Sequence, residues 1–288
     1  MKNVENSYKI IFLSGEDEIE ISPEAECRLV ENGVSGLSST GFDVKISSYA
    51  SNVGGYAQRR RFAEREISLA FEIVRGDENR VRRKLVSMMN PMKDCVLDIE
   101  MFGVHRLIDV IPYEEADFSR STFYDATEAV LRFIAPAVFF RDTEVRTIRF
   151  RDSAPMLTFP MNFMADAGTV SGVYRTTDRT AADNPGDYEC GITAVIRASG
   201  GDIVNPGIKC GDKFVKCPLT LSDGDELMID TRPRMKNIYK NGERCFTFDK
   251  NSVFFTLPAG KSDFSVICDT GGEYIDAYIT FTPLYFGM

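Results

Sequence analysis

Alternating apolar and polar positions dominate the first half of the chain. Every second residue of 67–73 is Ile, Leu or Phe, which predicts a strand with one face on a core. Residues 97–101 repeat the alternation before Gly103 and predict a hairpin that returns through 107–111. A further strand is predicted over 129–135, where the chain again alternates before a proline. The pattern therefore indicates a β-rich first half.

Shorter apolar segments lie nearer the start of the chain. Residues 19–21 and 42–46 are predicted strands, separated by the turn-rich segment 32–39. The segment Asn52–Tyr56 (NVGGY) is predicted to be a flexible loop, because its paired glycines leave the backbone unconstrained.

One helix is predicted between these strands. Asp77 is placed to cap its first turn, and the helix is expected to run to about Met89. Asn90-Pro91 ends it, because the residue before a proline is pushed away from helical geometry. Its buried stripe is expected to contain Val81, Leu85, Met88 and Met89.

The second half of the chain is predicted to be almost entirely strand. The candidate strands are 188–197, 218–221, 226–230, 235–240, 244–248, 252–257, 264–268 and 274–281. Turn residues separate them, and Asn241-Gly242 is the strongest signal, since a type I′ turn needs positive φ at both central residues. Many short strands with closely spaced turns indicate a β-sandwich or jelly roll.

A highly charged stretch with few bulky side chains, 141–153 (RDTEVRTIRFRDS), separates the two patterns. We therefore expect two domains, residues 1–140 and residues 141–288. The predicted fold class is mainly β, with an α+β first domain that contains the single helix.

Composition and charge narrow the range of functions. The net charge is −9, which argues against general nucleic-acid binding, because that binding depends on Lys and Arg neutralising phosphates. No apolar stretch approaches the roughly 18 residues that span a bilayer. The first residues lack the apolar core of a signal peptide, so we expect the chain to stay in the cytoplasm unless an assembly carries it out.

Candidate catalytic and ligand-binding motifs are few. The seven cysteines are scattered without a CxxC pair, and His105 is the only histidine, so no metal, no cofactor and free thiols are expected. Gly260-Lys261-Ser262 imitates the end of a phosphate-binding loop, but Phe255 stands where that loop needs glycine. The acids Asp223, Asp225, Glu226 and Asp230 fit a solvated turn, with a weak calcium site as the alternative. No catalytic constellation emerges, and the chain is not expected to be an enzyme.

The single basic cluster is Arg59-Arg60-Arg61, with Arg65 close behind. Arginine forks bind carboxylates through two parallel hydrogen bonds, so these four residues are candidates for contact with an adjacent copy of the chain. A plain solvated loop and a nucleic-acid contact remain as alternatives, the second without the interleaved aromatic residues of a base-stacking platform.

The order of these features resembles the distal tail proteins of siphophages. In the first half the matching segments are 54–71 (GGYAQRRRFAEREISLAF), the helix end at 88–91 and 128–140 (EAVLRFIAPAVFF). In the second half they are Asn205-Pro206-Gly207, 224–231 (GDELMIDT), Asn241-Gly242 and 252–260 (SVFFTLPAG). The resemblance covers nearly the whole chain and rests on the order and spacing of these segments.

The resemblance implies a structural role at the tip of a phage or phage-like tail. Residues 1–140 would form a ring, hexameric in this family and related in fold to tail-tube proteins. Residues 141–288 would form a galectin-like β-sandwich. The implied partners are other copies of the chain, the tail tube protein, a tail-associated hub or lysin protein, and receptor-binding proteins. DNA would pass through the channel without specific binding, and no membrane is involved. The implied location is the virion tail tip, after assembly in the bacterial host cytoplasm.

Two other hypotheses stay open on the sequence. The first is a carbohydrate-binding β-sandwich fused to an assembly domain, although the chain has no Trp to stack on sugar rings. The second is an enzyme built on paired carboxylates.

Overall fold

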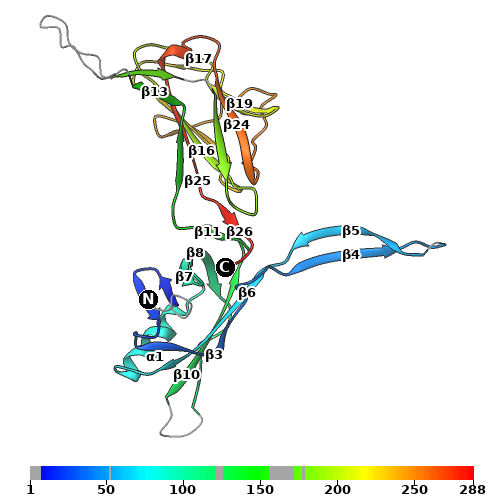
Figure 1. The fold of residues 1–288 in the computed structure, drawn as a ribbon, viewed down its shortest axis with the longest axis vertical. Coiled ribbons are helices and arrows are strands. Elements are labelled where there is room, and N and C mark those ends of the chain that lie inside the picture. The colour runs from blue at the N-terminus through cyan, green and yellow to red at the C-terminus, as the bar shows by residue number, and fades with distance from the viewer. Residues whose placement is uncertain (1–7, 52, 121–125, 156–171, 177–178) are drawn as a thin grey trace, which may run out of the picture. The chain divides into compact units, whose positions relative to one another are not determined.

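The computed structural model describes residues 8–51, 53–120, 126–155, 172–176 and 179–288. The chain divides into two compact units, Met1–Thr143 with Leu284–Met288, and Glu144–Pro283 (Figure 1). Strands account for almost all of the regular structure in both, so the mainly β fold expected from the sequence is confirmed.

The first unit is a closed barrel of seven strands. Its strands follow the order β8-β7-β1-β2-β3-β6-β10, and β10 closes the ring by pairing with β8. They are β1 (Lys9–Ser14), β2 (Asp17–Ile21), β3 (Cys27–Ser35), β6 (Arg65–Ile73), β7 (Cys95–Met101), β8 (Val104–Pro112) and β10 (Thr127–Ala135). Three short strands extend the sheet: β9 (Asp117–Ser119), β11 (Phe140–Asp142) and β26 (Leu284–Tyr285). Closure leaves the barrel strands few free edges.

The barrel interior follows directly from the apolar alternation. Ile67, Leu69 and Phe71 on β6 are all buried, and the register sets them beside the buried face of β10, with Leu69 opposite Leu131. The rings of Phe12 and Phe133 meet edge to face with centroids 5.0 Å apart. These contacts remove apolar surface from water and thereby stabilise the unit.

The predicted helix is α1 (Glu78–Met88). The Asp77 side chain accepts hydrogen bonds from the backbone amides of Asn79 and Arg80, as an N-cap should. Val81, Leu85 and Met88 are buried in the same core as the barrel strands. The Ser14 hydroxyl donates to the Met88 carbonyl at 2.9 Å, which ties the helix end to β1.

The second unit contains a six-stranded and a four-stranded antiparallel sheet, in the orders β12-β25-β16-β21-β22-β23 and β15-β24-β18-β19. Their strands are β12 (Arg146–Arg149), β15 (Arg179–Asn184), β16 (Ile192–Ala198), β18 (Gly207–Cys210), β19 (Lys213–Lys216), β21 (Glu226–Asp230), β22 (Asn237–Lys240), β23 (Glu243–Cys245), β24 (Gly260–Ile267) and β25 (Ile275–Phe281). Two minor pairs join β13 (Arg151–Pro155) to β14 (Gly172–Thr176), and β17 (Ile203–Val204) to β20 (Thr220–Leu221). A 3₁₀ turn, η2 (Gly272–Tyr274), precedes β25. The galectin-like shape implied by the resemblance stays a prediction.

The second unit also differs in detail from its sequence prediction. Residues 252–257 are not a strand: Val253 donates to the Phe214 carbonyl and Leu257 forms an isolated bridge with Cys190. Strands β15, β18 and β19 were not predicted, because short segments with mixed burial carry little alternation. Asn241 and Gly242 both have positive φ, as the turn prediction required.

The residues that follow the second unit, Leu284–Met288, belong to the first unit. The sequence assigned all of 141–288 to one domain, whereas Leu284–Met288 belong to the first unit. The reason is backbone pairing: β26 lies beside β11, with Phe140 opposite Tyr285. β11 in turn pairs with β8 of the barrel, so residues up to Thr143 also belong to the first unit.

The helix cap offers a test of the first unit. Replacing Asp77 by Ala leaves two amides of the first turn without their acceptor, and we expect the free energy of unfolding of this unit to fall by about 1 kcal/mol. Urea denaturation, with hydrogen exchange of the barrel amides as the readout, measures this change in the free energy of unfolding. Asp94→Ala is the control, because the exposed Asp94 carboxylate has no partner among the described residues. Equal losses in both variants would contradict a capping role.

Candidate subunit-contact surface

The basic cluster lies on a two-stranded arm of the first unit. The arm consists of β4 (Phe42–Ser48) and β5 (Gly55–Phe62), which pair antiparallel as a sheet of their own (Figure 1). Neither strand pairs with any other strand in the described part of the chain. An isolated pair of strands is marginally stable in water at best, so this arm is expected to need a partner surface.

The register separates the arm's side chains onto two faces. Phe42 lies opposite Phe62 and Val44 opposite Arg60, and directly paired residues share a face of the sheet. The other face carries the pairs Asp43–Arg61 and Lys45–Arg59. One face is therefore largely apolar and the other is charged.

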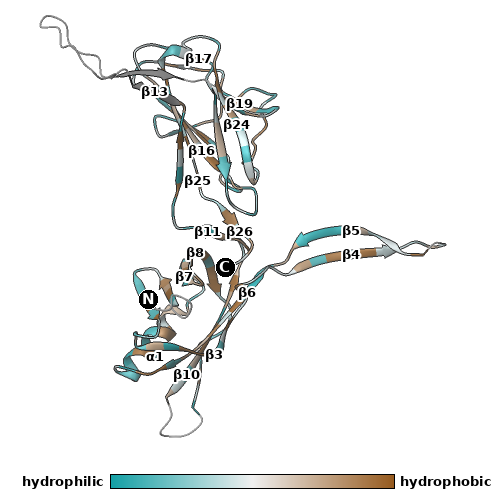
Figure 2. Cartoon of the chain, in the orientation of Figure 1, coloured by the Kyte–Doolittle hydropathy of each residue, from teal (hydrophilic) through white to brown (hydrophobic). Residues whose placement is uncertain are grey.

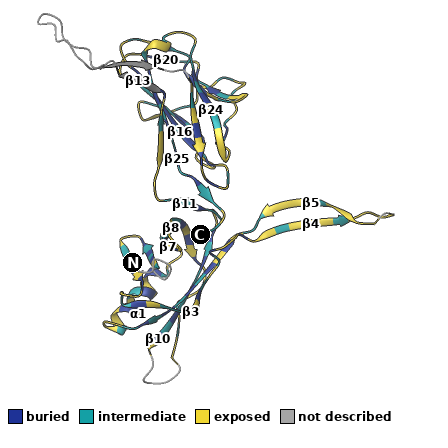
Figure 3. Cartoon of the chain, viewed as in Figure 1, coloured by how far each residue is buried: buried dark blue, intermediate teal, exposed yellow. Residues whose placement is uncertain are grey.

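The apolar face is uncovered in the single chain. Phe42 is 68% exposed, Val44 51% and Ile46 67%. Figure 2 shows apolar residues along β4 and hydrophilic residues along much of β5, and Figure 3 shows that both strands are mostly exposed. Fully burying one such side chain contributes about 1.5–3 kcal/mol, so covering this stripe would provide a substantial part of an interface.

Arg59, Arg60 and Arg61 are exposed on β5. The Arg61 Nε donates to the Asp43 carboxylate at 2.7 Å across the strand pair. The arm 42–62 carries four basic side chains and one acidic one, in a chain whose net charge is −9. The three arginines therefore lie in strand β5 and not in a plain solvated loop. The strand also includes Gly55 and Tyr56 of the loop predicted at Asn52–Tyr56, whose Asn52 lies outside the described residues.

Arg65 differs from the other three arginines. It is the first residue of β6, its exposed fraction is 1%, and its guanidinium donates only to backbone carbonyls. These belong to Val138 (2.7 Å), Gly36 (2.5 Å) and Phe286. The prediction that Arg65 contacts another subunit is therefore corrected: its donors are used inside the first unit.

The Arg65 charge is buried without an acidic partner among the described residues. Burial lowers the pKa of Arg65 to about 10, which leaves the guanidinium charged at neutral pH. The Phe140 ring lies beneath it, 4.7 Å from the guanidinium carbon to the ring centroid. The carbonyl dipoles and the ring face thus stabilise a charge that would otherwise be costly to bury.

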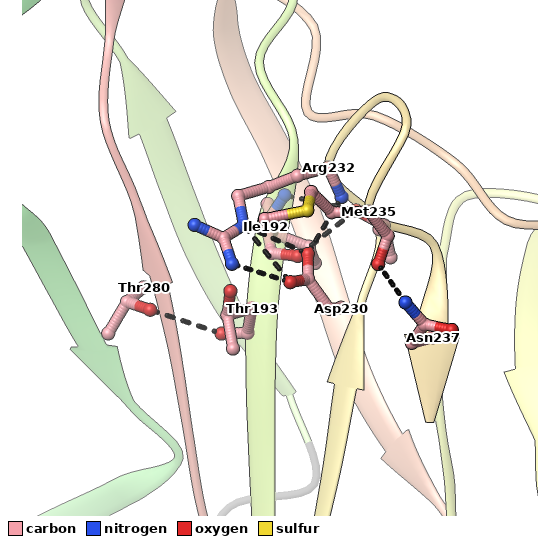
Figure 4. A network of polar contacts seen from close by, with 8 residues as sticks. Ile192, Thr193, Asp230, Arg232, Met235, Asn237 and Thr280 are labelled. Atoms are coloured by element: carbon pink, nitrogen blue, oxygen red, sulfur yellow. Dashed lines mark hydrogen bonds and ion pairs between the residues drawn. The ribbon is translucent and has the colours of Figure 1, made fainter. Parts of the chain in front are cut away.

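The four acids predicted as a turn all have partners in neighbouring groups, and Glu226 accepts from Arg197 at 2.5 Å. Asp225 accepts from the Asn241 amide at 2.8 Å and from Lys240, and Asp223 accepts from the Gly200 amide. The side chain of buried Asp230 forms a fork with Arg232 (Figure 4). In the part of the chain that the structure describes, no group of three or more His, Cys, Asp or Glu could hold a metal ion.

The remaining sequence motifs lie in ordinary strand pairs. The Nε2 of His105 lies 2.5 Å from the Asp98 carboxylate across the β7–β8 hairpin. Gly260-Lys261-Ser262 begins β24 and pairs with β15, an arrangement that cannot cradle a phosphate. No described helix is long and apolar enough to cross a membrane.

The seven cysteines are free thiols in the structure. Burial raises the pKa of Cys27 to about 11, and of Cys190 and Cys217 to about 12. Since the thiolate is the reactive form, these three residues are poor nucleophiles at neutral pH.

A hollow of about 450 Å³ on the four-stranded sheet bears on the carbohydrate hypothesis. Exposed Arg179, Lys209 and Asp263 line it. Its one aromatic residue, Phe264, is 1% exposed, so the ring cannot stack on a sugar. The hollow therefore lacks the feature that would favour sugar binding.

The Arg65 contacts predict a large loss on substitution. Arg65→Met leaves three carbonyls without their donor, and we expect the free energy of unfolding of the first unit to fall by about 3 kcal/mol. Chemical denaturation measures this change. Arg60→Met on the exposed strand is the matched control and should change stability by less than about 0.5 kcal/mol. A tolerated Arg65→Met would show that these hydrogen bonds do not hold the unit together.

The acidic turn predicts a specific titration. Hydrogen bonds from Asn241 and Lys240 lower the pKa of Asp225 to about 2. A carboxyl with a depressed folded pKa stabilises the fold above its unfolded pKa of about 4, and this contribution is lost as pH falls towards 2. Stability should therefore fall more between pH 4 and 2 in the wild type than in Asp225→Asn. NMR titration of the carboxyl tests it directly, and a midpoint near 4 would contradict the structure.

Comparison with known proteins gives structural matches and no sequence matches. No protein-family model matches the chain, and no curated protein sequence does either. The crystal structure of the phage SPP1 Dit protein, described as a paradigm of the hub adsorption apparatus in phages that infect Gram-positive hosts, matches with a TM-score of 0.68 and 13% identity. The match covers 96% of this chain and 98% of that one.

The baseplate of phage P2 in its activated conformation gives a second match. A chain from the calcium form has a TM-score of 0.50 and 12% identity, over 96% of this chain and 97% of that one. The strontium form gives the same values. Both comparisons extend over nearly the full length of the chain. The resemblance to siphophage distal tail proteins is thus confirmed at the level of the fold.

Proposed function

We propose that the protein is a structural subunit of a phage or phage-like tail tip, a distal tail protein without catalytic activity. Copies of the chain form a ring, hexameric as the resemblance implies, that joins the tail tube to the tail-tip hub. The observation that carries the proposal is the match of both units together, over 96% of the chain, to the SPP1 Dit protein.

The arm supports assembly into a ring. A ring is built from one repeated interface, in which each copy presents two different patches. The apolar stripe Phe42, Val44 and Ile46 with the neighbouring arginines provides one such patch. Because the chain is acidic, an adjacent copy offers carboxylates that these arginines can bind. Arg59, Arg60 and Arg61 are therefore proposed as subunit-contact residues.

The remaining partners follow from the same proposal. The ring contacts the tail tube protein on one side and a hub or lysin protein on the other, and the second unit is a platform for receptor-binding proteins. DNA passes through the channel without specific binding. The protein resides at the virion tail tip after assembly in the host cytoplasm.

A charge placed on the apolar stripe tests the ring. Val44→Asp puts a carboxylate where the interface must exclude water, and it should weaken association about tenfold to a hundredfold. Val86→Asp on α1 is the matched control, because Val86 is 61% exposed and lies outside the arm. Analytical ultracentrifugation gives the association constants, and electron microscopy after co-expression with the tube and hub proteins gives the assembly.

Two results would contradict the proposal. One is a wild-type chain that stays monomeric even with the tube and hub proteins present. The other is equal association of the Val44→Asp and Val86→Asp variants, which would show that the arm takes no part in the interface.

A further inference from the structure

Residues Leu284–Met288 return to the first unit and pack at the base of the arm. The chain reaches them only after it has passed through the whole second unit. Leu284 and Tyr285 form β26, which pairs with Arg141 and Phe140 of β11. The guanidinium of Arg106 lies over the Tyr285 ring at 3.7 Å and donates to the Gly287 carbonyl. These five residues are held by backbone pairing, by a hydrogen bond and by a cation–π contact.

The returning residues contact the segment by which the chain leaves the barrel for the arm. The Met288 amide donates to the Leu37 carbonyl at 3.0 Å. At Gly287 the approach is so close that a Cβ would lie 1.7 Å from the Ser38 carbonyl oxygen. Only glycine fits against the departing chain at this position.

The same residues contact the strand by which the chain comes back. The Phe286 ring lies 5.5 Å from Phe62, the last residue of the arm, and 5.7 Å from Phe139. Phe62 and Phe139 meet edge to face at 5.2 Å. Three rings from three distant parts of the sequence therefore pack together where the arm joins the barrel.

Arg65 connects these contacts. It is the first barrel residue after the arm, and it donates to Gly36, just after β3, and to Phe286. The Arg65 side chain thus bonds both the segment that leads into the arm and residue 286. Its own backbone begins the strand that returns from the arm. Without 284–288, the arm base would keep the Gly36 and Val138 contacts and the Phe62–Phe139 ring contact. It would lose the Phe286 ring and the hydrogen bonds of Phe286 and Met288.

We propose that residues 284–288 are a latch that fixes the direction of the arm, so that the chain becomes competent to assemble only when these residues have docked. The inference rests on the proposed function in one respect, that the arm contacts a second copy. An unlatched arm samples many directions, and association must then also overcome the entropy of ordering it. Self-association through the arm therefore depends on residues 284–288, which follow the second unit in the sequence.

Two variants of different chemistry release the latch. Phe286→Ala removes the ring from the cluster, and Gly287→Ala forces the segment away from Ser38 by the clash described above. Met92→Ala is the control, since Met92 is an exposed side chain of the same unit. Each variant is made in the wild-type chain and again in the Val44→Asp chain. Association is weakened in the Val44→Asp chain, so contact with a second copy cannot mask a change in hydrogen exchange at the arm base.

Hydrogen exchange of the amides of 36–41 and 62–66 reports the arm base directly. We expect exchange there to rise at least about tenfold in both latch variants, with the association constant lower by about tenfold, and no change in Met92→Ala. Unchanged exchange at the arm base overturns the latch, and so does faster exchange with undiminished association. If the wild type does not associate even with the tube and hub proteins present, the proposed function fails, while the exchange comparison still decides whether 284–288 fix the arm.

Discussion

The buried guanidinium of Arg65 is the interaction on which the first unit depends. A charge inside a barrel is costly unless every donor has a partner, and here the partners are carbonyls from three separate parts of the chain. Those parts are the segment that leads from β3 into the arm, the turn after β10 and the segment that follows the second unit. Arg65 therefore does more than fill space: it determines which segments must come together before the fold is complete.

Closure of the barrel explains why the arm stands out as the proposed contact surface. The barrel strands pair with one another around the ring and leave few unpaired edges. Among the described strands none pairs with the outer edges of the arm, and its apolar stripe is exposed. Its arginines limit unspecific association, because a partner must supply opposite charges as well as an apolar surface.

The full-length match at 13% identity to the SPP1 Dit protein shows what the fold requires. At this identity, many different side chains are compatible with the same arrangement of strands. Specific partners, by contrast, depend on individual surface residues, which differ at most positions between such distant sequences. The proposed ring therefore depends on the arm of this chain, and not on the likeness alone.

The sequence by itself determined the local structure: the strands at 67–73 and 129–135, the helix capped by Asp77 and the turn at Asn241-Gly242. These follow from the period of the apolar side chains and from backbone preferences that act within a few residues. It could not distinguish the exposed stripe Phe42, Val44 and Ile46 from a barrel strand, since the alternation is the same and only packing decides which face is covered. Nor could it separate Arg65 from Arg59, Arg60 and Arg61, or place Phe286 beside Phe62. Those assignments depend on contacts between residues as many as 224 positions apart along the chain, which only the tertiary structure brings together.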